Sequence, residues 1–362
     1  MSVYGATSTE TNRFDNQSRA YDALLVLSFG GPEGPDDVRP FLHNVTAGRN
    51  VPAARLDEVA EHYLHFDGVS PINAQNRALI AALETELREH GPNLPIYFGN
   101  RNWHPYVTDT IRQMREDGVS RALVFVTSAL SSYSGCRQYR EDVIRALDTL
   151  ETDEPGFDKL RVFYNHPGFI EPMISQTQAA LDTITPERRS TTRLIFTAHS
   201  IPLSMARHCA YELQLREASR LVAEGVGFTD HVIAYQSRSG PPQVPWLEPD
   251  ILDVLESERD NGTTDVLVVP IGFISDHMEV LFDLDTEAKE KATDLGINLV
   301  RVGTVGTDPR FVQMIRELIV ERMTADPERP ALGSRGPNHD ICPLNCCLIG
   351  STGRPTSASA KD

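Results

Sequence analysis

The stretch VLVVPIGFISDHMEVLFDLDTEA, residues 266–288, decides the fold of this chain and holds its strongest functional signal. Residues 266–271 form a short apolar run rich in β-branched side chains, which predicts a buried strand. Pro270 and Gly272 end that strand. Ser275 is suited to cap a helix, and the apolar spacing beyond it predicts a helix through Met278, Leu281, Phe282 and Leu284.

Three carboxylates share one face of that predicted helix, because Glu279, Asp283 and Glu287 follow each other at i, i+4 and i+8. Like charges at this spacing destabilise a helix, and a cation bound along the face would offset the repulsion. The alternative is a solvated acidic face near a helix N-terminus, where the dipole favours anions. His277 and Glu279 stand just beyond a buried strand, where open α/β sheets bind ligands, and this placement favours a site.

The rest of the chain alternates predicted strands with predicted helices, which favours an α/β fold with parallel sheets. Strands are expected at residues 22–29, 94–98, 121–126, 160–164, 193–197, 231–236 and 299–302. Helices are expected at residues 35–44, 53–66, 106–117, 172–181, 211–224, 250–259 and 311–323, with one more beginning at Ser70 and Pro71 and one ending near Thr149.

Composition and charge exclude several classes of function. The formal net charge of −17 argues against a nucleic-acid partner. No apolar run approaches the ~20 residues that a membrane span needs, and the N-terminus lacks the basic and apolar regions of a signal peptide. We therefore expect a monomeric cytoplasmic enzyme, with disordered segments at residues 1–20 and 348–362.

Several side chains at predicted strand ends are candidate ligand contacts. His199 follows a strand directly, and imidazole is a common metal ligand and base. Arg101 has a planar fork suited to carboxylates, although most arginines simply lie at the surface. Ser70 could cap a helix instead, and Phe29 could pack in the core. The other candidates are Tyr133, Tyr139 and Trp246. Together they predict an amphipathic cleft for a large flat ligand beside a divalent metal site.

The five cysteines are unevenly spread. Cys136 and Cys209 are isolated, whereas Cys342, Cys346 and Cys347 crowd together near the C-terminus. In a reducing cytosol such a cluster favours a metal site over a disulfide framework. Cys209 is expected to be an ordinary buried thiol.

Several stretches resemble the ferrochelatase family in order and spacing. They are AHSIP at residues 198–202, QSRSGPPQVPWLEP at 236–249 and VPIGFISDHMEVLFDLD at 269–285, with FGGPE, GVSPI and RNWHP in the first half. The resemblance covers about residues 22–325 and implies two similar Rossmann-like domains of the chelatase type, each a parallel sheet flanked by helices, with the active cleft between them. It implies that residues 21–165 and 307–347 form one domain and residues 166–306 the other.

The resemblance also implies a reaction. Such a lyase inserts Fe²⁺ into a free-base porphyrin in haem biosynthesis and releases two protons. His199 and Glu279 match the metal-handling pair of the family, and Asp283 and Glu287 would offer a hydrated path for cations or protons. The implied porphyrin contacts are Phe29, Ser70, Arg101, Tyr133, Tyr139, Trp246 and His277. Some members have Tyr at the position of Phe29, so any phenolate ligand here must come from Tyr133 or Tyr139.

The C-terminal cysteines are similar to those of actinobacterial members, for which the expected porphyrin is coproporphyrin III, with protoporphyrin IX as the alternative. Those members use four cysteines for a [2Fe–2S] cluster, and all-thiolate ligation suits such a cluster. The matching residues here are Cys136, Cys342, Cys346 and Cys347. The adjacent pair is sterically awkward for a shared cluster, and Zn²⁺ is the alternative metal.

Two competing interpretations remain open at this stage. A cobalt or nickel tetrapyrrole chelatase of related fold would carry a pair of metal-binding histidines without the SDHMEVLFDLD helix. A haem-binding or iron–sulfur sensor would have lost catalysis, and the presence of both His199 and Glu279 argues against it.

Overall fold

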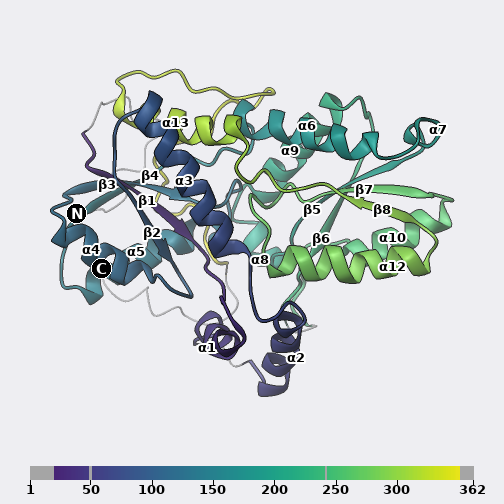
Figure 1. Cartoon of the computed structure of the whole chain (residues 1–362), viewed down its shortest axis with the longest axis horizontal. Coiled ribbons are helices and arrows are strands. Elements are labelled where there is room, and N and C mark those ends of the chain that lie inside the picture. Colours follow the sequence, from purple (N-terminus) through teal and green to yellow (C-terminus); the bar gives the residue numbers. More distant parts are fainter. Residues whose placement is uncertain (1–19, 49–50, 241–242, 351–362) are drawn as a thin grey trace.

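The computed structural model describes residues 20–48, 51–240 and 243–350, and it contains two four-stranded parallel sheets (Figure 1). The predicted disordered segments therefore lie outside the described residues, apart from residues 20 and 348–350. Within the described ranges, no helix is long and apolar enough to cross a membrane. The predicted α/β class with two parallel sheets is confirmed.

The first sheet has the strand order β2-β1-β3-β4. Its strands are β1 (Ala23–Ser28), β2 (Ile96–Asn100), β3 (Arg121–Val126) and β4 (Gly156–Lys159). The central strand β1 is buried on both faces, as expected of a parallel sheet covered by helices. Helices α3 (Ile72–His90) and α13 (Pro309–Met323) pack on one face, and α4 (Val107–Glu116) and α5 (Gln138–Thr149) pack on the other.

The second sheet repeats this plan with the order β6-β5-β7-β8. Its strands are β5 (Arg193–His199), β6 (Val232–Gln236), β7 (Asp265–Val269) and β8 (Asn298–Arg301). One face carries α6 (Pro167–Asp182) and α9 (Tyr211–Gly225). The other carries α10 (Ile251–Asp260), the π-helix η2 (Leu281–Ala288) and α12 (Lys289–Asp294). Short helices are α7 (Pro186–Arg189), α8 (Leu203–Ala206) and α11 (Met278–Val280).

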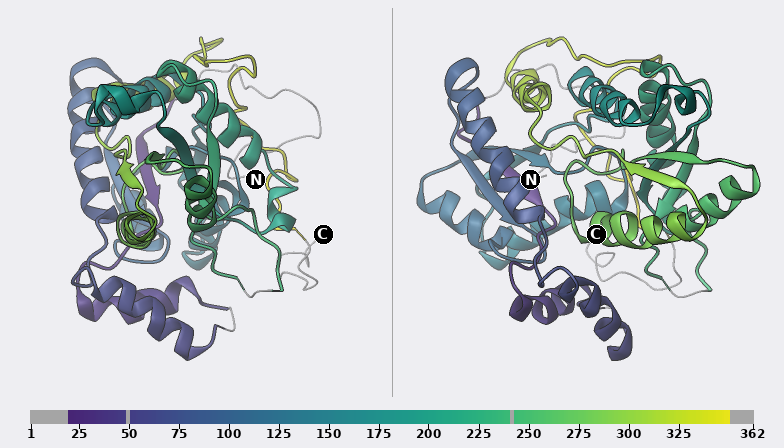
Figure 2. Two further views of the ribbon diagram at one scale, coloured as in Figure 1. Left: turned by 90° about the vertical axis from the view of Figure 1, so that its right-hand side faces the viewer. Right: turned by 45° about the vertical axis from the view of Figure 1, so that its right-hand side comes forward.

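The two halves share one core. Helix α13 packs against both α3 of the first half and α6 of the second, along the upper edge of Figures 1 and 2. The rings of Phe163, Phe169 and Phe311 contact one another edge to face or tilted at that junction. Arg161, which is 0% exposed, makes two hydrogen bonds of 2.7 and 2.9 Å to Glu321 of α13. The last helix therefore ties the halves into one body.

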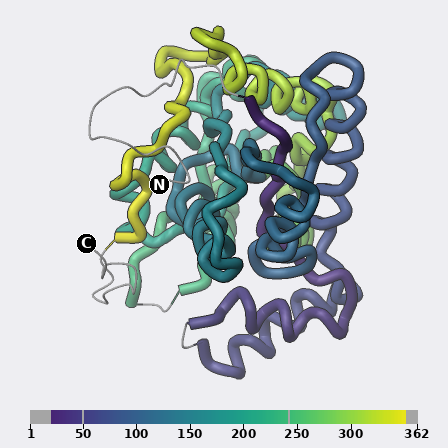
Figure 3. Tube along the Cα trace, turned by 90° about the vertical axis from the view of Figure 1, so that its left-hand side faces the viewer, coloured from purple at the N-terminus to yellow at the C-terminus, as the bar shows by residue number. Residues whose placement is uncertain are grey.

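Two helices stand apart from both sheets. Helices α1 (Pro35–Val45) and α2 (Ala53–Leu64) project below the sheets in Figures 1 and 2. They form their own small core, in which Phe41 contacts Phe29, Tyr63 and Trp103 edge to face. At the other end of the chain, the last described residues run down one side of the molecule beyond α13 (Figure 3).

Three local predictions are wrong. The strand expected at residues 160–164 is the preceding segment Gly156–Lys159, because the apolar run after it is buried by packing instead of strand pairing. Ser70 caps no helix, since α3 begins at Ile72 with Pro71 at its N-cap. Ser275 is likewise not a cap, because that position belongs to His277.

Candidate active site

The last residue of β5 places an imidazole at the edge of the second sheet. The Nδ1 of His199 contacts the carbonyl oxygen of Ser200, and because a carbonyl only accepts, Nδ1 carries the hydrogen. The hydroxyl of Tyr211 in α9 donates to the His199 carbonyl over 2.9 Å. The backbone N–H of Ser200 donates to the carbonyl of Gln236 over 2.8 Å. These contacts fix the ring and leave Nε2 available for chemistry.

A carboxylate faces that free nitrogen. The Oε1 of Glu279 lies 3.5 Å from Nε2 of His199. Burial alone would lower the pKa of His199, but the negative charge of Glu279 outweighs it and raises that pKa to about 9. Burial opposes ionisation of Glu279, but the His199 charge holds the pKa of this carboxyl at about 2. The two groups therefore form an ion pair at neutral pH.

A second histidine caps the helix turn that carries Glu279. His277 is the N-cap of α11, and its Nδ1 accepts from the backbone N–H of Glu279 over 3.2 Å. An accepting Nδ1 carries no proton, and burial lowers the pKa of His277, so this ring is neutral. Its Nδ1 is 3.9 Å from Oε2 of Glu279. An unprotonated Nδ1 offers the carboxylate no hydrogen bond, so His277 holds the backbone at Glu279 and not its side chain.

The predicted regular helix after Glu279 is instead the π-helix η2. π-Helical turns are rare and often mark functional sites. The amide of Gln236, at the end of β6, donates to the carbonyl of Glu279 over 2.8 Å. Ser237, held in the left-handed region at φ +63°, donates its hydroxyl to Asp283. Burial raises the pKa of Asp283 to about 7.

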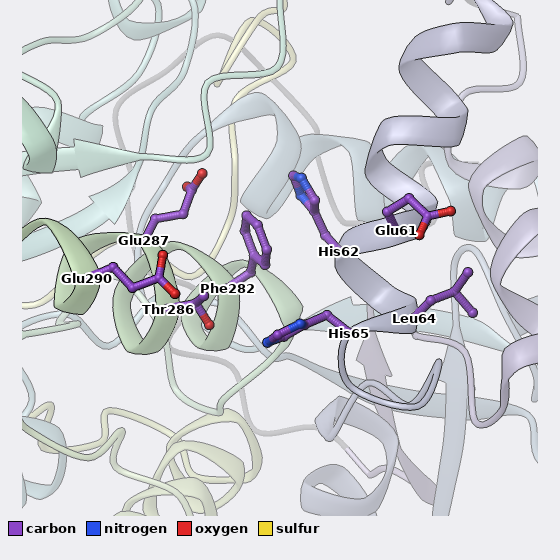
Figure 4. A pocket seen from close by; sticks show the side chains of 8 residues that line it. All are labelled: Glu61, His62, Leu64, His65, Phe282, Thr286, Glu287 and Glu290. Atoms are coloured by element: carbon purple, nitrogen blue, oxygen red, sulfur yellow. The ribbon is translucent and has the colours of Figure 1, made fainter.

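A cavity of about 580 Å³ opens beside Glu287, the outermost of the three carboxylates. Figure 4 shows it between α2 and η2, with Glu287 on the η2 side. The His62 ring stacks on Phe282 at 3.7 Å between centroids, so α2 closes on η2. Burial raises the pKa of Tyr63 in α2, and the charges of Glu279 and Asp283 add to that rise.

Three of the other candidate residues lie together in the first half of the chain. Phe29 follows β1 directly, and the Arg101 guanidinium lies 5.8 Å from its ring and 4.8 Å from the ring of Tyr139. Arg101 pairs with Asp142, and both side chains are under 10% exposed. The sequence predicted that Arg101 could bind a carboxylate of a ligand. In the structure its guanidinium is already paired with Asp142 of the same chain.

The other candidate porphyrin contacts occupy separate places. Tyr133 opens the π-helix η1 (Tyr133–Arg137) and donates to Glu141 over 2.8 Å. Ser70 is buried, and a Cβ added at Gly31 would lie 2.7 Å from its Cβ. Trp246 has a buried indole N–H without a partner among the described residues.

All the predicted cluster ligands converge beside η1. The nearby thiol of Cys342 raises the pKa of Cys136, and that of Cys347 lowers it in part. The Sγ atoms of Cys346 and Cys347 are 3.5 Å apart. Burial would lower the pKa of Lys159, but the negative charge of these cysteines outweighs it and raises that pKa. Four converging thiols beside a buried cation fit an all-thiolate, negatively charged group.

The two parallel four-stranded sheets have the fold of the chelatase class. SirB from Bacillus subtilis, solved with Fe³⁺, has the same fold, with a TM-score of 0.50 at 14% identity over 84% of this chain and 96% of that one. A family comparison matches residues 21–323 to Ferrochelatase. The chain belongs to the ferrochelatase family.

Curated relatives agree over nearly the whole chain. A ferrochelatase of Rhodopirellula baltica is 54% identical, covering 94% of this chain and 97% of its own. A coproporphyrin III ferrochelatase of Streptomyces coelicolor is 51% identical, covering 94% and 96%.

Sequence reasoning missed several residues that build these sites. Tyr63 and His62 stand on a helix with no motif, so only packing brings them to the carboxylates. Gln236 and Ser237 lie in the QSRSGPP segment, where a polar pair at a strand end was the available signal. His339 has an Nε2 only 3.8 Å from the Sγ of Cys346, and the short spacing to the cysteines could have indicated it.

Proposed function

We propose that this protein inserts Fe²⁺ into coproporphyrin III during haem biosynthesis and releases two protons. Family membership supports the reaction, and relatives at about half identity are named coproporphyrin III ferrochelatases. Protoporphyrin IX is the alternative substrate, since another relative is named only as a ferrochelatase. We also propose the domain division at residues 165/166 and 306/307, a cytoplasmic location and a monomer.

The observation that carries the proposal is the 3.5 Å contact between Nε2 of His199 and Oε1 of Glu279. Imidazole nitrogen and carboxylate oxygen both bind Fe²⁺, and both also accept protons. Incoming iron would replace the proton that the two groups share. The pair would then take up the two pyrrole protons as iron passes to the porphyrin nitrogens.

Supporting residues hold this pair in place. His277 would hold the backbone N–H of Glu279, and Gln236 would hold its carbonyl through the 2.8 Å hydrogen bond. Asp283 and Glu287 would exchange cations and protons with the surface cavity. The rings of Phe29 and Tyr139 would cover the apolar face of the macrocycle.

For the cysteines, we propose a [2Fe–2S] cluster held by Cys136, Cys342, Cys346 and Cys347. The convergence of the four thiols beside the buried Lys159 supports this ligand set. The cluster would link the C-terminal segment to the first half of the chain, and its binding would stabilise the fold. It would also be redox-active. Arg137 already clamps the tail, donating to the carbonyls of Leu344 and Cys346 over 2.6 and 3.1 Å.

An anaerobic insertion assay with Fe²⁺ and each porphyrin tests the reaction. Wild-type protein should convert coproporphyrin III with a higher kcat/KM than protoporphyrin IX. His199→Ala should bind porphyrin but insert no iron, and the exposed His208→Ala serves as the matched control. Glu279→Gln should lose far more activity than Glu287→Gln, which lies at the surface cavity. Normal turnover by His199→Ala would refute the assignment.

A further inference from the structure

A fifth metal-binding side chain belongs to the cysteine site. One donor atom each from His339, Cys342 and Cys346 lies within 4.8 Å of the other two. Within this group, Nε2 of His339 lies 3.8 Å from Sγ of Cys346. The [2Fe–2S] assignment uses only thiolates, so it leaves this imidazole without a role.

These distances have the size of a single tetrahedral coordination sphere. Zn–S bonds of about 2.3 Å and Zn–N bonds of about 2.0–2.1 Å give S···S edges of about 3.8 Å and N···S edges of about 3.6 Å. The contact of 3.8 Å between His339 and Cys346, and that of 3.5 Å between Cys346 and Cys347, match those edges. One divalent ion could therefore bind here with little movement of the side chains.

The backbone holds these donors in position before any ion arrives. A turn bonds the N–H of Cys346 to the carbonyl of Pro343 over 3.0 Å. Cys347 adopts φ +53°, in the left-handed region that few non-glycine residues enter. Arg137 holds the same turn through the carbonyls of Leu344 and Cys346. Such preorganisation lowers the entropic cost of binding.

We propose that this site has a second occupant: in the absence of the iron–sulfur cluster, His339, Cys342 and Cys346 bind one Zn²⁺ ion, with Cys347 beside the fourth position. Mixed imidazole and thiolate ligation of this kind is typical of structural zinc. Cys342 and Cys346 belong to both ligand sets, so the two metal states exclude each other. Cys136 belongs only to the cluster set. The proposal does not depend on the porphyrin reaction.

Co²⁺ binding tests the proposal, because tetrahedral Co²⁺ with thiolate ligands gives intense visible and near-ultraviolet absorption. The full-length chain, stripped of metal under anaerobic reducing conditions, is titrated in a His199→Ala, Glu279→Gln background so that the His–Glu site is not counted. We expect one Co²⁺ per chain and displacement by Zn²⁺. His339→Ala should weaken binding by at least about tenfold, the loss that even an outer-shell partner causes.

Matched variants separate this site from a four-thiolate site. Cys136→Ser and the exposed His208→Ala should each leave Co²⁺ affinity within about twofold. X-ray absorption of the zinc-loaded protein should show nitrogen as well as sulfur in the first shell, a measurement that needs no variant to fold. An all-sulfur shell, or affinity lost in Cys136→Ser and kept in His339→Ala, would overturn the proposal.

Discussion

The proton on His199 should compete directly with the metal. Its pKa is about 9 in place of the ordinary 6.5, because the charge of Glu279 outweighs the effect of burial. At pH 7 a group with that pKa is unprotonated in about one molecule in a hundred. Binding of a divalent ion through this nitrogen should therefore strengthen about tenfold per pH unit from pH 7 to pH 9, then level off.

Replacement of Glu279 by Gln removes the interaction that raises this pKa. Burial then opposes only the weaker effects of the Ser200 carbonyl and Asp283, so the pKa of His199 should fall well below 9 in Glu279→Gln. The pair also makes stability depend on pH. A raised folded-state pKa stabilises the protein fully below pH 6.5, and that contribution is lost as the pH rises through about 9.

Histidine ring resonances, followed by NMR against pH, measure this pKa directly, with His199→Ala to assign the signal. Glu287→Gln is the control, because that carboxylate lies at the outer cavity and should leave the His199 midpoint near pH 9. A wild-type midpoint near 6.5, or one unchanged in Glu279→Gln, would refute the coupling between the two groups.

Other substitutions test the supporting structure. Gln236→Leu leaves the Glu279 carbonyl without its donor and should lower kcat about tenfold without changing KM for porphyrin in steady-state assays. Cys136→Ser should lose visible iron–sulfur absorption and melt at a lower temperature, whereas Cys209→Ser should keep both in parallel spectra and thermal scans. Arg161→Met strands a buried carboxylate on α13 and should cost about 3–5 kcal/mol in urea unfolding; no loss would mean that its partner carries no charge.

The fold could be predicted wherever periodicity and burial agree. Strands β3 and β7 are apolar runs covered on both faces, and the alternation with helices gives parallel sheets. The prediction failed at residues 160–164, because burial there comes from the junction with α13. A single sequence shows that such a run is buried but not which element buries it.

The site was predictable only where a strand end determines position. His199 ends β5, and Glu279 lies on the helix that follows the adjacent parallel strand β7, so the strand order brings both to one edge of the sheet. Side-chain contacts between segments far apart in the sequence leave no pattern in the sequence that predicts them. Asp142 forms an ion pair with Arg101, and Gln236 donates a hydrogen bond to the carbonyl of Glu279. In each case the two residues are separated by roughly forty positions in the sequence.

The three carboxylates differ in charge because their surroundings differ, and this difference bears on the proposed reaction. His199 holds Glu279 ionised with a pKa of about 2, while burial raises the pKa of Asp283 to about 7 and also raises that of Glu287. At neutral pH Asp283 therefore holds a proton part of the time. A divalent cation beside the outer carboxylates favours their ionised forms, so each inward step of iron would expel protons outward. Asp283→Asn should remove the part of the rise in kcat/KM for Fe²⁺ that is centred near pH 7 and keep the part that His199 causes near pH 9. A profile unchanged by Asp283→Asn would contradict this exchange.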